Sequence, residues 1–405
     1  MLGKSERRNN KAWPSTPNEP RGPRPAHRTR RRTMATQLSP ESHEERVYNG
    51  RAWEDFCDGL KAAGQVIFRP EAPDTMLDRA EGWRWLTRLT RAALDMAVEY
   101  GDPAFPGFYQ LSNHTIRIGA DNPDNTYFNA TITADHDYRI SGYRGTAPIL
   151  TFGSKANRYA IDGTMATTGE IDQRTLKVDE NGYFEIIVSQ KEHPGNWLRL
   201  EPDSTMVIGR ETFLDRATEK PCAIRIERIG RVGGPPPLSA KQIDEALQET
   251  ARWVHGTAKT FADWAQLFAK DPNDLPPVHQ AMSINGGGDP TIRYYHGYWE
   301  LKPDEALVIE SEVPDCVFWN FQLNNYWMES LEYRYLPVHV NKHSARYQPD
   351  GSVMIVVAAE DPGVGHFLTT DGHATGTMLL RWVFADSDPQ PRCRVAKIAD
   401  LRAGK

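Results

Sequence analysis

Residues Tyr294–Pro362 read YYHGYWELKPDEALVIESEVPDCVFWNFQLNNYWMESLEYRYLPVHVNKHSARYQPDGSVMIVVAAEDP. The stretch is dense in aromatic and β-branched residues, which favour pleated, half-buried strands. Proline and glycine interrupt it at turn-like positions. This combination predicts several consecutive β-strands, and the rest of the chain is interpreted from them.

Alternation is strict within Val317–Leu323, and it separates two faces. Neighbouring side chains of a strand point to opposite sides, so one face carries Val317, Trp319, Phe321 and Leu323. We expect Trp319 and Phe321 to be core. The other face is rich in carboxamides and carries Phe318, Asn320, Gln322 and, beyond the run, Asn324. Amides beside aromatic residues line a ligand-binding groove or form the solvated outer face of a β-sandwich, and the sequence leaves both possibilities open.

Five regions follow one another along the chain. The pattern predicts a disordered basic tail at 1–46, a helical segment at 47–108, a first β-sandwich domain at 109–230, a linker and connecting helix at 231–290, and a second β-sandwich domain at 291–405. Apolar residues at helical spacing predict helices at Val47–Ala63 and Asp74–Tyr100. Ser239 and Gln242 form a capping box that opens a longer helix, reaching about Lys270. The predicted fold class is mainly β with added helices (α+β), with two related β-sandwich or jelly-roll domains, a helical N-terminal segment and a helical connector.

Two parts of the chain resemble each other, which predicts a duplicated domain. Asp179–Leu198 and Pro349–Leu368 both run from a turn with glycine through an apolar strand to a Pro-Gly turn and an aromatic-Leu pair. Two further matches pair Thr205–Arg210 with Thr377–Arg381 and Tyr127–Ile132 with Phe318–Leu323. The matches keep one order along the chain. Residues 120–229 and 303–395 are therefore predicted to share one topology, with the helix at 239–270 between them.

Three runs in these segments are Asn196–Leu198, Asp315–Leu323 and Gly376–Trp382. With the Pro-Asp-Gly and Asp-Pro-Gly turns between them, they resemble the domain-of-unknown-function 1214 family. The resemblance covers Ala120–Ile229 and Pro303–Leu401, about half of the chain. It implies paired jelly-roll domains with attached helices. It implies no catalytic residues, because the family has no assigned activity.

Charge is unevenly distributed over the 405 residues. Residues 1–33 hold ten Lys and Arg and two Glu, a net +8, which leaves −14 for the remainder of a chain with formal net charge −6. An acidic remainder argues against nucleic acid and anionic membranes as main partners. The basic run is interpreted as a solvated tail, or as a segment upstream of a translation start at Met34. A nucleic-acid arm and a targeting peptide are the alternatives.

Cysteine usage and hydropathy bear on the compartment. The four cysteines lie far apart and form no Cys-x-x-Cys pair, which favours reduced thiols. No apolar run reaches the roughly 18 residues of a membrane span, and the N-terminus has no signal-peptide core. The sequence therefore predicts a cytoplasmic protein without a membrane partner, and leaves a homo-oligomer possible.

Binding by amides and aromatic rings is the chemistry that the sequence supports best. Asn and Gln offer paired donors and acceptors, and Trp and Tyr rings stack on apolar faces of ligands. The predicted ligand-binding residues are Asn320, Gln322, Asn324, Trp327, Tyr333 and His339. No metal site is predicted, because His339 and His343 would lie roughly 13 Å apart on a regular strand. No cofactor is predicted and no catalytic residue is assigned.

Two functional hypotheses follow. In the first, the protein binds or acts on a neutral hydroxylated small molecule, glycan-like or sterol-like, in a polar-aromatic groove of the second β-domain. In the second, it is a non-catalytic scaffold or oligomerisation module whose polar faces are only surface. A concave site that collects Asn320, Gln322 and His339 would favour the first hypothesis.

Overall fold

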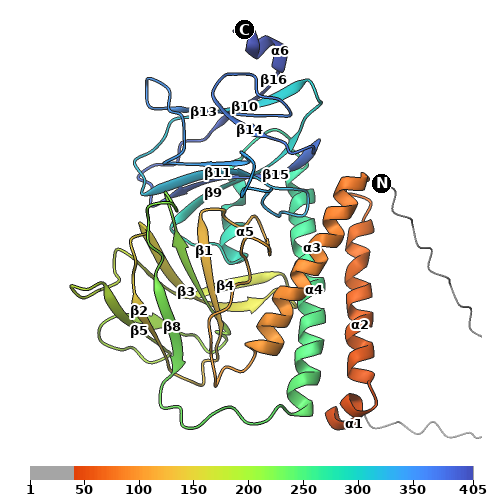
Figure 1. Ribbon diagram of the computed structural model, residues 1–405, viewed down its shortest axis with the longest axis vertical. Helices are drawn as coiled ribbons and strands as arrows, with labels where there is room; N and C mark the ends of the chain where they lie inside the picture. Colours follow the sequence, from red (N-terminus) through yellow and green to blue (C-terminus); the bar gives the residue numbers. More distant parts are fainter. Residues whose placement is uncertain (1–40, 405) are drawn as a thin grey trace, which may run out of the picture. The chain divides into compact units, whose positions relative to one another are not determined.

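The structure, a computed structural model, describes residues 41–404 (Figure 1). The disordered tail predicted at 1–46 falls mostly outside the described residues. Where the two overlap the prediction is wrong, because the first helix, α1, spans His43–Tyr48. Ser42 accounts for its start: the Ser42 hydroxyl accepts the N–H of Glu45, and the Glu45 carboxylate accepts the N–H of Ser42. This is a capping box just before the predicted helical segment.

The longer helices pack side by side. The helical elements after α1 are α2 (Arg51–Ala63), η1 (Gly64–Phe68), α3 (Met76–Leu94), η2 (Asp95–Glu99), α4 (Ala240–Phe268), η3 (Pro277–His279), α5 (Gln280–Asn285) and α6 (Ile398–Arg402). α4 runs beside α2 and α3 (Figure 1). The connecting helix predicted from Ser239 is confirmed, and the Ser239 hydroxyl accepts the N–H of Gln242. The helix predicted at Val47–Ala63 is instead two helices that meet at Gly50, which has a left-handed φ of 85°. None of the helices in the described part of the chain combines the length and the apolar composition that a bilayer crossing requires.

Two β-units contain the strands of the described residues. The first unit has β1 (Asn125–Thr131), β2 (Tyr138–Tyr143), β3 (Ile149–Arg158), β4 (Thr164–Asp172), β5 (Tyr183–Ser189), β6 (Trp197–Arg199), β7 (Met206–Thr212) and β8 (Ala223–Arg228). The second has β9 (Ile292–Glu300), β10 (Glu305–Ser311), β11 (Phe318–Leu323), β12 (His339–Asn341), β13 (Val353–Ala358), β14 (His366–Thr369), β15 (Thr375–Val383) and β16 (Arg392–Lys397). Each unit is a pair of four-stranded sheets.

Strand order is the same in the two units. The sheets β1-β7-β3-β4 and β6-β5-β2-β8 of the first unit recur as β9-β15-β11-β12 and β14-β13-β10-β16 in the second. The predicted fold class, mainly β with two related sandwich domains and added helices, is confirmed. The order also corrects one sequence match. β1 corresponds to β9, so the match of Tyr127–Ile132 with Phe318–Leu323 in β11 is wrong. The two segments share an aromatic-amide pattern although they occupy different places in their sheets.

Both faces of β11 are buried. Trp319 and Phe321 lie in the core of the second β-unit, as predicted, and each is 0% exposed. The amide face is not solvated, because Asn320, Gln322 and Asn324 are also 0% exposed. That face points toward the first β-unit instead of toward water.

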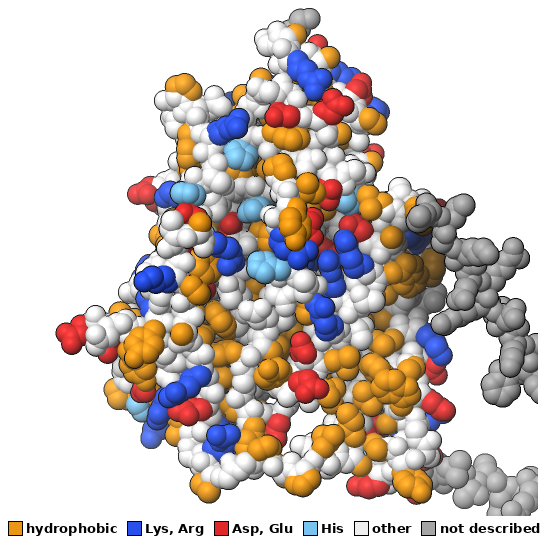
Figure 2. Space-filling view, viewed as in Figure 1, with side chains coloured by type: hydrophobic (Ala, Val, Ile, Leu, Met, Phe, Trp, Pro, Cys, Tyr) orange, Lys and Arg blue, Asp and Glu red, His pale blue; other side chains and the backbone are white. Residues whose placement is uncertain are grey.

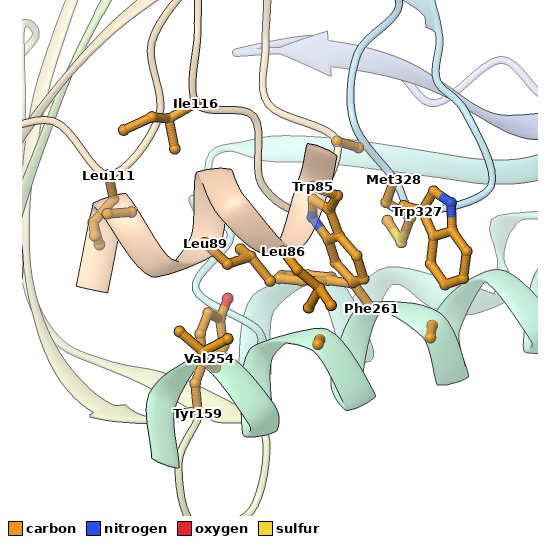
Figure 3. Close-up of a cluster of buried hydrophobic side chains, with 14 of the residues drawn as sticks. Trp85, Leu86, Leu89, Leu111, Ile116, Tyr159, Val254, Phe261, Trp327 and Met328 are labelled. Carbon is orange, nitrogen blue, oxygen red and sulfur yellow. The ribbon is translucent and has the colours of Figure 1, made fainter. Parts of the chain in front are cut away.

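A further core joins the helices to both β-units (Figure 3). Trp85 of α3 stacks on Trp327 of the second unit, with ring centroids 5.4 Å apart. Phe261 of α4 meets Tyr159 of the first unit edge to face at 5.6 Å. Gly82 of α3 makes room for Trp327, since a Cβ there would lie 2.9 Å from the indole ring. The helices therefore hold the two β-units in one packed body.

Candidate functional site

The predicted amide face forms the junction between the two β-units. Asn320 Nδ2 donates to Asn122 Oδ1 at 2.8 Å, and Gln322 Nε2 donates to the carbonyl oxygen of Asp121 at 2.9 Å. Gln322 Nε2 also donates to Asn324 Oδ1 at 2.6 Å. These three amides are bonded inside the protein, so they line no open groove.

Of the other three predicted residues, Trp327 lies apart, while Tyr333 and His339 lie together at the edge of this junction with their ring centroids 5.9 Å apart. Trp327 belongs to the helical core. The Tyr333 hydroxyl lies 3.0 Å from His114 Nδ1, and His339 Nε2 lies 3.4 Å from Asp124 Oδ1. Figure 2 shows Lys, Arg and His side chains on the face where the two β-units meet. The predicted six-residue site is therefore not assembled as one pocket.

A cavity of about 150 Å³ lies beside the junction. Its walls come from the segment before β1, from β1, β4 and β7 of the first unit, from β9 and β15 of the second, and from α4 and the turn after α5. Its apolar side is lined by Trp253, Phe261 and Trp264 of α4. Its polar side carries Tyr127, Arg210, Tyr294, His296 and Arg381. None of the six predicted binding residues is among its described lining residues, so the prediction from the sequence did not include this site.

The polar side is built from the same two residue types in each β-unit. Tyr127 of β1 lies opposite Arg210 of β7, and Tyr294 of β9 lies opposite Arg381 of β15. Because β1 and β7 correspond to β9 and β15, the two Tyr–Arg pairs hold equivalent positions. Directly opposed residues of an antiparallel pair share one face of the sheet. Each unit thus contributes one such pair to the same cavity.

A turn with the pattern Asx-Pro precedes each of these tyrosines. Asn122 lies five residues before Tyr127, and Asp289 lies five residues before Tyr294. The backbone N–H of Asn122 donates to the Tyr127 hydroxyl at 2.8 Å, and that of Asp289 donates to the Tyr294 hydroxyl at 2.9 Å. Each hydroxyl proton stays available for an acceptor in the cavity. The shared spacing Asx-Pro-x-x-x-Tyr is a sequence signal that would have found the site.

Arg381 has its donors occupied by neutral acceptors. Its Nη1 donates to Gln322 Oε1 at 2.6 Å and to Asn320 Oδ1 at 3.3 Å, and its Nη2 donates to the carbonyl oxygen of Ala120. Burial lowers the pKa of Arg381, and Tyr127 and Tyr294 oppose this shift. The guanidinium remains charged at neutral pH. Two predicted binding residues, Asn320 and Gln322, therefore orient Arg381, which links the second β-unit to the first.

Arg210 has fewer partners than Arg381. Its Nη2 donates to the carbonyl oxygen of Gly287 at 2.6 Å, and its Nη1 is buried with no partner among residues 41–404. Burial alone would lower the pKa of Arg210, but Asp289, Tyr294 and Glu170 hold it above its usual value. Arg210 is thus a charged side chain with a hydrogen-bond donor left over.

Three other polar side chains of the cavity, those of His296, Tyr127 and Tyr294, are neutral at physiological pH. Burial lowers the pKa of His296 well below its usual value, and Arg381 and His279 add to this effect. Burial also raises the pKa of Tyr127, and it raises that of Tyr294 to about 12. Within the described residues, Nδ1 of His296 is buried and has no partner. The cavity therefore offers guanidinium groups, phenol hydroxyls and a neutral imidazole to an occupant.

A separate polar cluster lies between α3 and the second β-unit. His373 Nε2 lies 2.8 Å from a carboxylate oxygen of Glu81, and its Nδ1 lies 3.0 Å from the carbonyl oxygen of Thr370. Both partners are acceptors, so both ring nitrogens donate and His373 is an imidazolium. Burial opposes charge on both residues, but their hydrogen bond raises the pKa of His373 and lowers that of Glu81.

This pair should make stability depend on pH. The His373 contribution is complete below its unfolded pKa of 6.5 and is lost as pH rises through the higher folded value. The Glu81 contribution is complete above its unfolded pKa of 4.5 and is lost as pH falls through the lower folded value. The pair therefore stabilises the fold most between pH 4.5 and 6.5.

Urea unfolding of wild type and His373→Gln at about pH 6 and about pH 8.5 measures this contribution. The free-energy advantage of wild type over the variant should shrink at the higher pH, because His373 loses its charge in the folded state. His255, exposed on α4, serves as the control through His255→Gln. An advantage of wild type over His373→Gln that stays constant with pH would contradict the ion pair.

Comparison with known proteins places the fold but brings no activity with it. No family model and no curated protein matches the sequence. Among solved structures, the chain is similar to an uncharacterized protein from Burkholderia cenocepacia, with 48% identity, a TM-score of 0.86, and coverage of 88% of this chain and 99% of that chain. It also aligns with the VPA0106 protein from Vibrio parahaemolyticus at 12% identity and a TM-score of 0.43, covering 78% of this chain and 98% of that chain. The resemblance to the domain-of-unknown-function 1214 family stays a prediction.

Proposed function

Because the chain belongs to the same family as the uncharacterized protein from Burkholderia cenocepacia, whose name assigns no activity, we propose from the cavity itself that the protein binds a small molecule between its two β-units. The supporting observation is that two residues lining this space have buried side-chain nitrogens without hydrogen-bond partners among the described residues. Arg210 Nη1 and His296 Nδ1 are buried and unbonded within residues 41–404. Buried polar groups are nearly always hydrogen-bonded, and each one left unpaired costs roughly 1–3 kcal/mol. An occupant that accepts these bonds removes that cost.

The size of the cavity limits the ligand. Its volume is about 150 Å³. An apolar cavity of about this volume in another protein holds benzene, whereas drug-sized ligands occupy roughly 300–1,000 Å³. The ligand is therefore a single ring with few substituents, or an acyclic molecule of that size. The proposal keeps small-molecule binding, but it moves the site from the amide face to the cavity and replaces a glycan-like or sterol-like ligand with a smaller one.

Filling the cavity tests the proposal. Ile208 of β7 lines the wall. Ile208→Phe should place a ring in the existing space, while Ile208→Leu keeps the side-chain volume. Single-ring compounds are screened by thermal shift, in which a ligand at 100 times its Kd adds about 2.7 kcal/mol to stability. We expect compounds that stabilise wild type and Ile208→Leu but not Ile208→Phe.

The opposite results have distinct meanings. Compounds that stabilise all three proteins equally bind elsewhere, and the cavity is then not the site. A screen in which no compound stabilises wild type would favour the alternative function, a non-catalytic scaffold or oligomerisation module. Size-exclusion chromatography over a concentration series then tests that alternative directly.

A further inference from the structure

We propose that the ligand is a small acid with one anionic group, which binds Arg210 and the Tyr294 hydroxyl, and with an apolar ring that lies against the aromatic side chains of α4. This inference rests on the proposed function and names the class of ligand. It follows from the charge of the wall, from the unequal bonding of the two arginines, and from the position of the apolar side.

Positive charge predominates on the cavity wall. Arg210 and Arg381 line it, and Asp121 is the one carboxyl among its described lining residues. Asp121 is already bonded, because the Ser330 hydroxyl and backbone N–H donate to its two oxygens at 2.9 Å and 3.2 Å. Burial also raises the pKa of Asp121, which disfavours its charged form. An occupant with a negative charge therefore completes the charge balance of the cavity.

Two carboxylates near the cavity, those of Asp289 and Glu170, do not take the place of an anionic ligand at Arg210. Asp289 accepts the N–H and hydroxyl of Thr291 at 2.9 Å and 2.5 Å, and Glu170 pairs with Lys155 at 2.7 Å. Both carboxylates influence the pKa of Arg210, yet neither forms an ion pair with it within the described residues. A guanidinium binds a carboxylate best through two parallel N–H···O bonds. Among residues 41–404, Arg210 has no such partner.

The two arginines differ in what they can still bind. Arg381 donates from Nη1 to Gln322 and Asn320, and from Nη2 to the carbonyl oxygen of Ala120. Arg210 donates from Nη2 to the carbonyl oxygen of Gly287, and its Nη1 has no hydrogen-bond partner within residues 41–404. One anionic group is therefore favoured over two, and its place is at Arg210.

Tyr294 lies close enough to Arg210 to share the anion. Arg210 bonds to Gly287, and the Tyr294 ring lies 3.2 Å from where a Cβ of Gly288 would be, so both side chains contact one turn. Arg210 is also the charged group with the largest effect on the pKa of Tyr294. The hydroxyl accepts from Asp289, which leaves its own proton for an anionic oxygen.

The remaining volume suits an apolar body. Trp253, Phe261 and Trp264 of α4 line the cavity, and the side chains of Ile208 and Leu379 add aliphatic surface. Aromatic rings pack edge to face or offset against such side chains. Benzoate is the simplest molecule with these two parts, and benzamide has the same shape without the charge.

Isothermal titration calorimetry with benzoate and benzamide tests the inference on the full-length protein. Wild type should bind benzoate roughly 10- to 100-fold more tightly than benzamide, the range for hydrogen bonds to a charged group. Arg210→Gln should remove that preference, and Tyr294→Phe should weaken benzoate binding roughly tenfold. Arg252→Gln, at an exposed position of α4, removes a positive charge away from the cavity and should change nothing.

Each alternative result is decisive. The inference is overturned if the two probes bind equally, or if benzoate binding is unchanged in both Arg210→Gln and Tyr294→Phe. The proposed function still holds in that case if the compound screen gives cavity-dependent hits. Binding of neither probe also overturns the inference, and the proposed function fails with it only if the screen is empty. Should Arg210→Gln fail to fold, Tyr294→Phe decides, because it removes a single hydroxyl.

Discussion

Trp319→Ala should destabilise the protein by about 3–5 kcal/mol, the usual loss when a fully buried aromatic side chain is truncated. Trp319 is 0% exposed in the core of the second β-unit. Its ring lies 5.7 Å from that of Trp382, and its Nε1 donates to the Tyr347 hydroxyl at 3.2 Å. The variant therefore loses packing contacts and one hydrogen bond at once, and a cavity remains. Chemical denaturation of both proteins measures the difference.

Trp53→Ala is the matched control for this experiment. Trp53 lies on α2 and is 60% exposed, so its truncation should cost under about 1 kcal/mol. If the two substitutions have equal effects, the second β-unit does not have its core around β11.

Gln322→Leu should cost about 2–5 kcal/mol, although the side-chain volume is nearly kept. The amide of Gln322 donates to the Asp121 carbonyl and to Asn324, and it accepts from Arg381. Each buried group left without its partner costs roughly 1–3 kcal/mol, and leucine replaces none of these bonds. A solvated face would lose less than about 1 kcal/mol. The size of the loss therefore distinguishes a buried junction from a surface.

Gln65→Leu provides the control, since Gln65 is exposed in η1 and should tolerate the change within about 0.5 kcal/mol. Both variants are unfolded by urea under the same conditions. A loss at Gln322 as small as that at Gln65 would mean that the two β-units are not joined through this amide.

Local patterns in the sequence predicted the elements well and their partners poorly. The capping box at Ser239 and the buried positions Trp319 and Phe321 depend on neighbours within one helix or strand, which the sequence displays directly. The opposite, amide-bearing face of β11 packs against a turn near Asn122, which lies far away along the chain. Alternation shows that Asn320 and Trp319 face opposite ways, but it does not show what covers the second face.

The candidate site was missed for a related reason. Its polar side combines β1 and β7 with β9 and β15, so it exists only once the two β-units are packed. The matches Thr205–Arg210 with Thr377–Arg381 did pair the two arginines. Matching Tyr127–Ile132 to β11 instead of β9 hid the equivalent tyrosine, Tyr294, and with it the second Tyr–Arg pair.

The unequal bonding of these two arginines bears on how the protein evolves. Duplication begins with two equivalent residues, and each is then free to take its own role. Arg381 now links the two β-units, so its replacement should weaken their junction in this protein. Arg210 makes one such structural hydrogen bond, to the carbonyl oxygen of Gly287. A substitution at Arg210 should therefore change what the cavity binds while the hydrogen bonds of Arg381 across the junction stay in place.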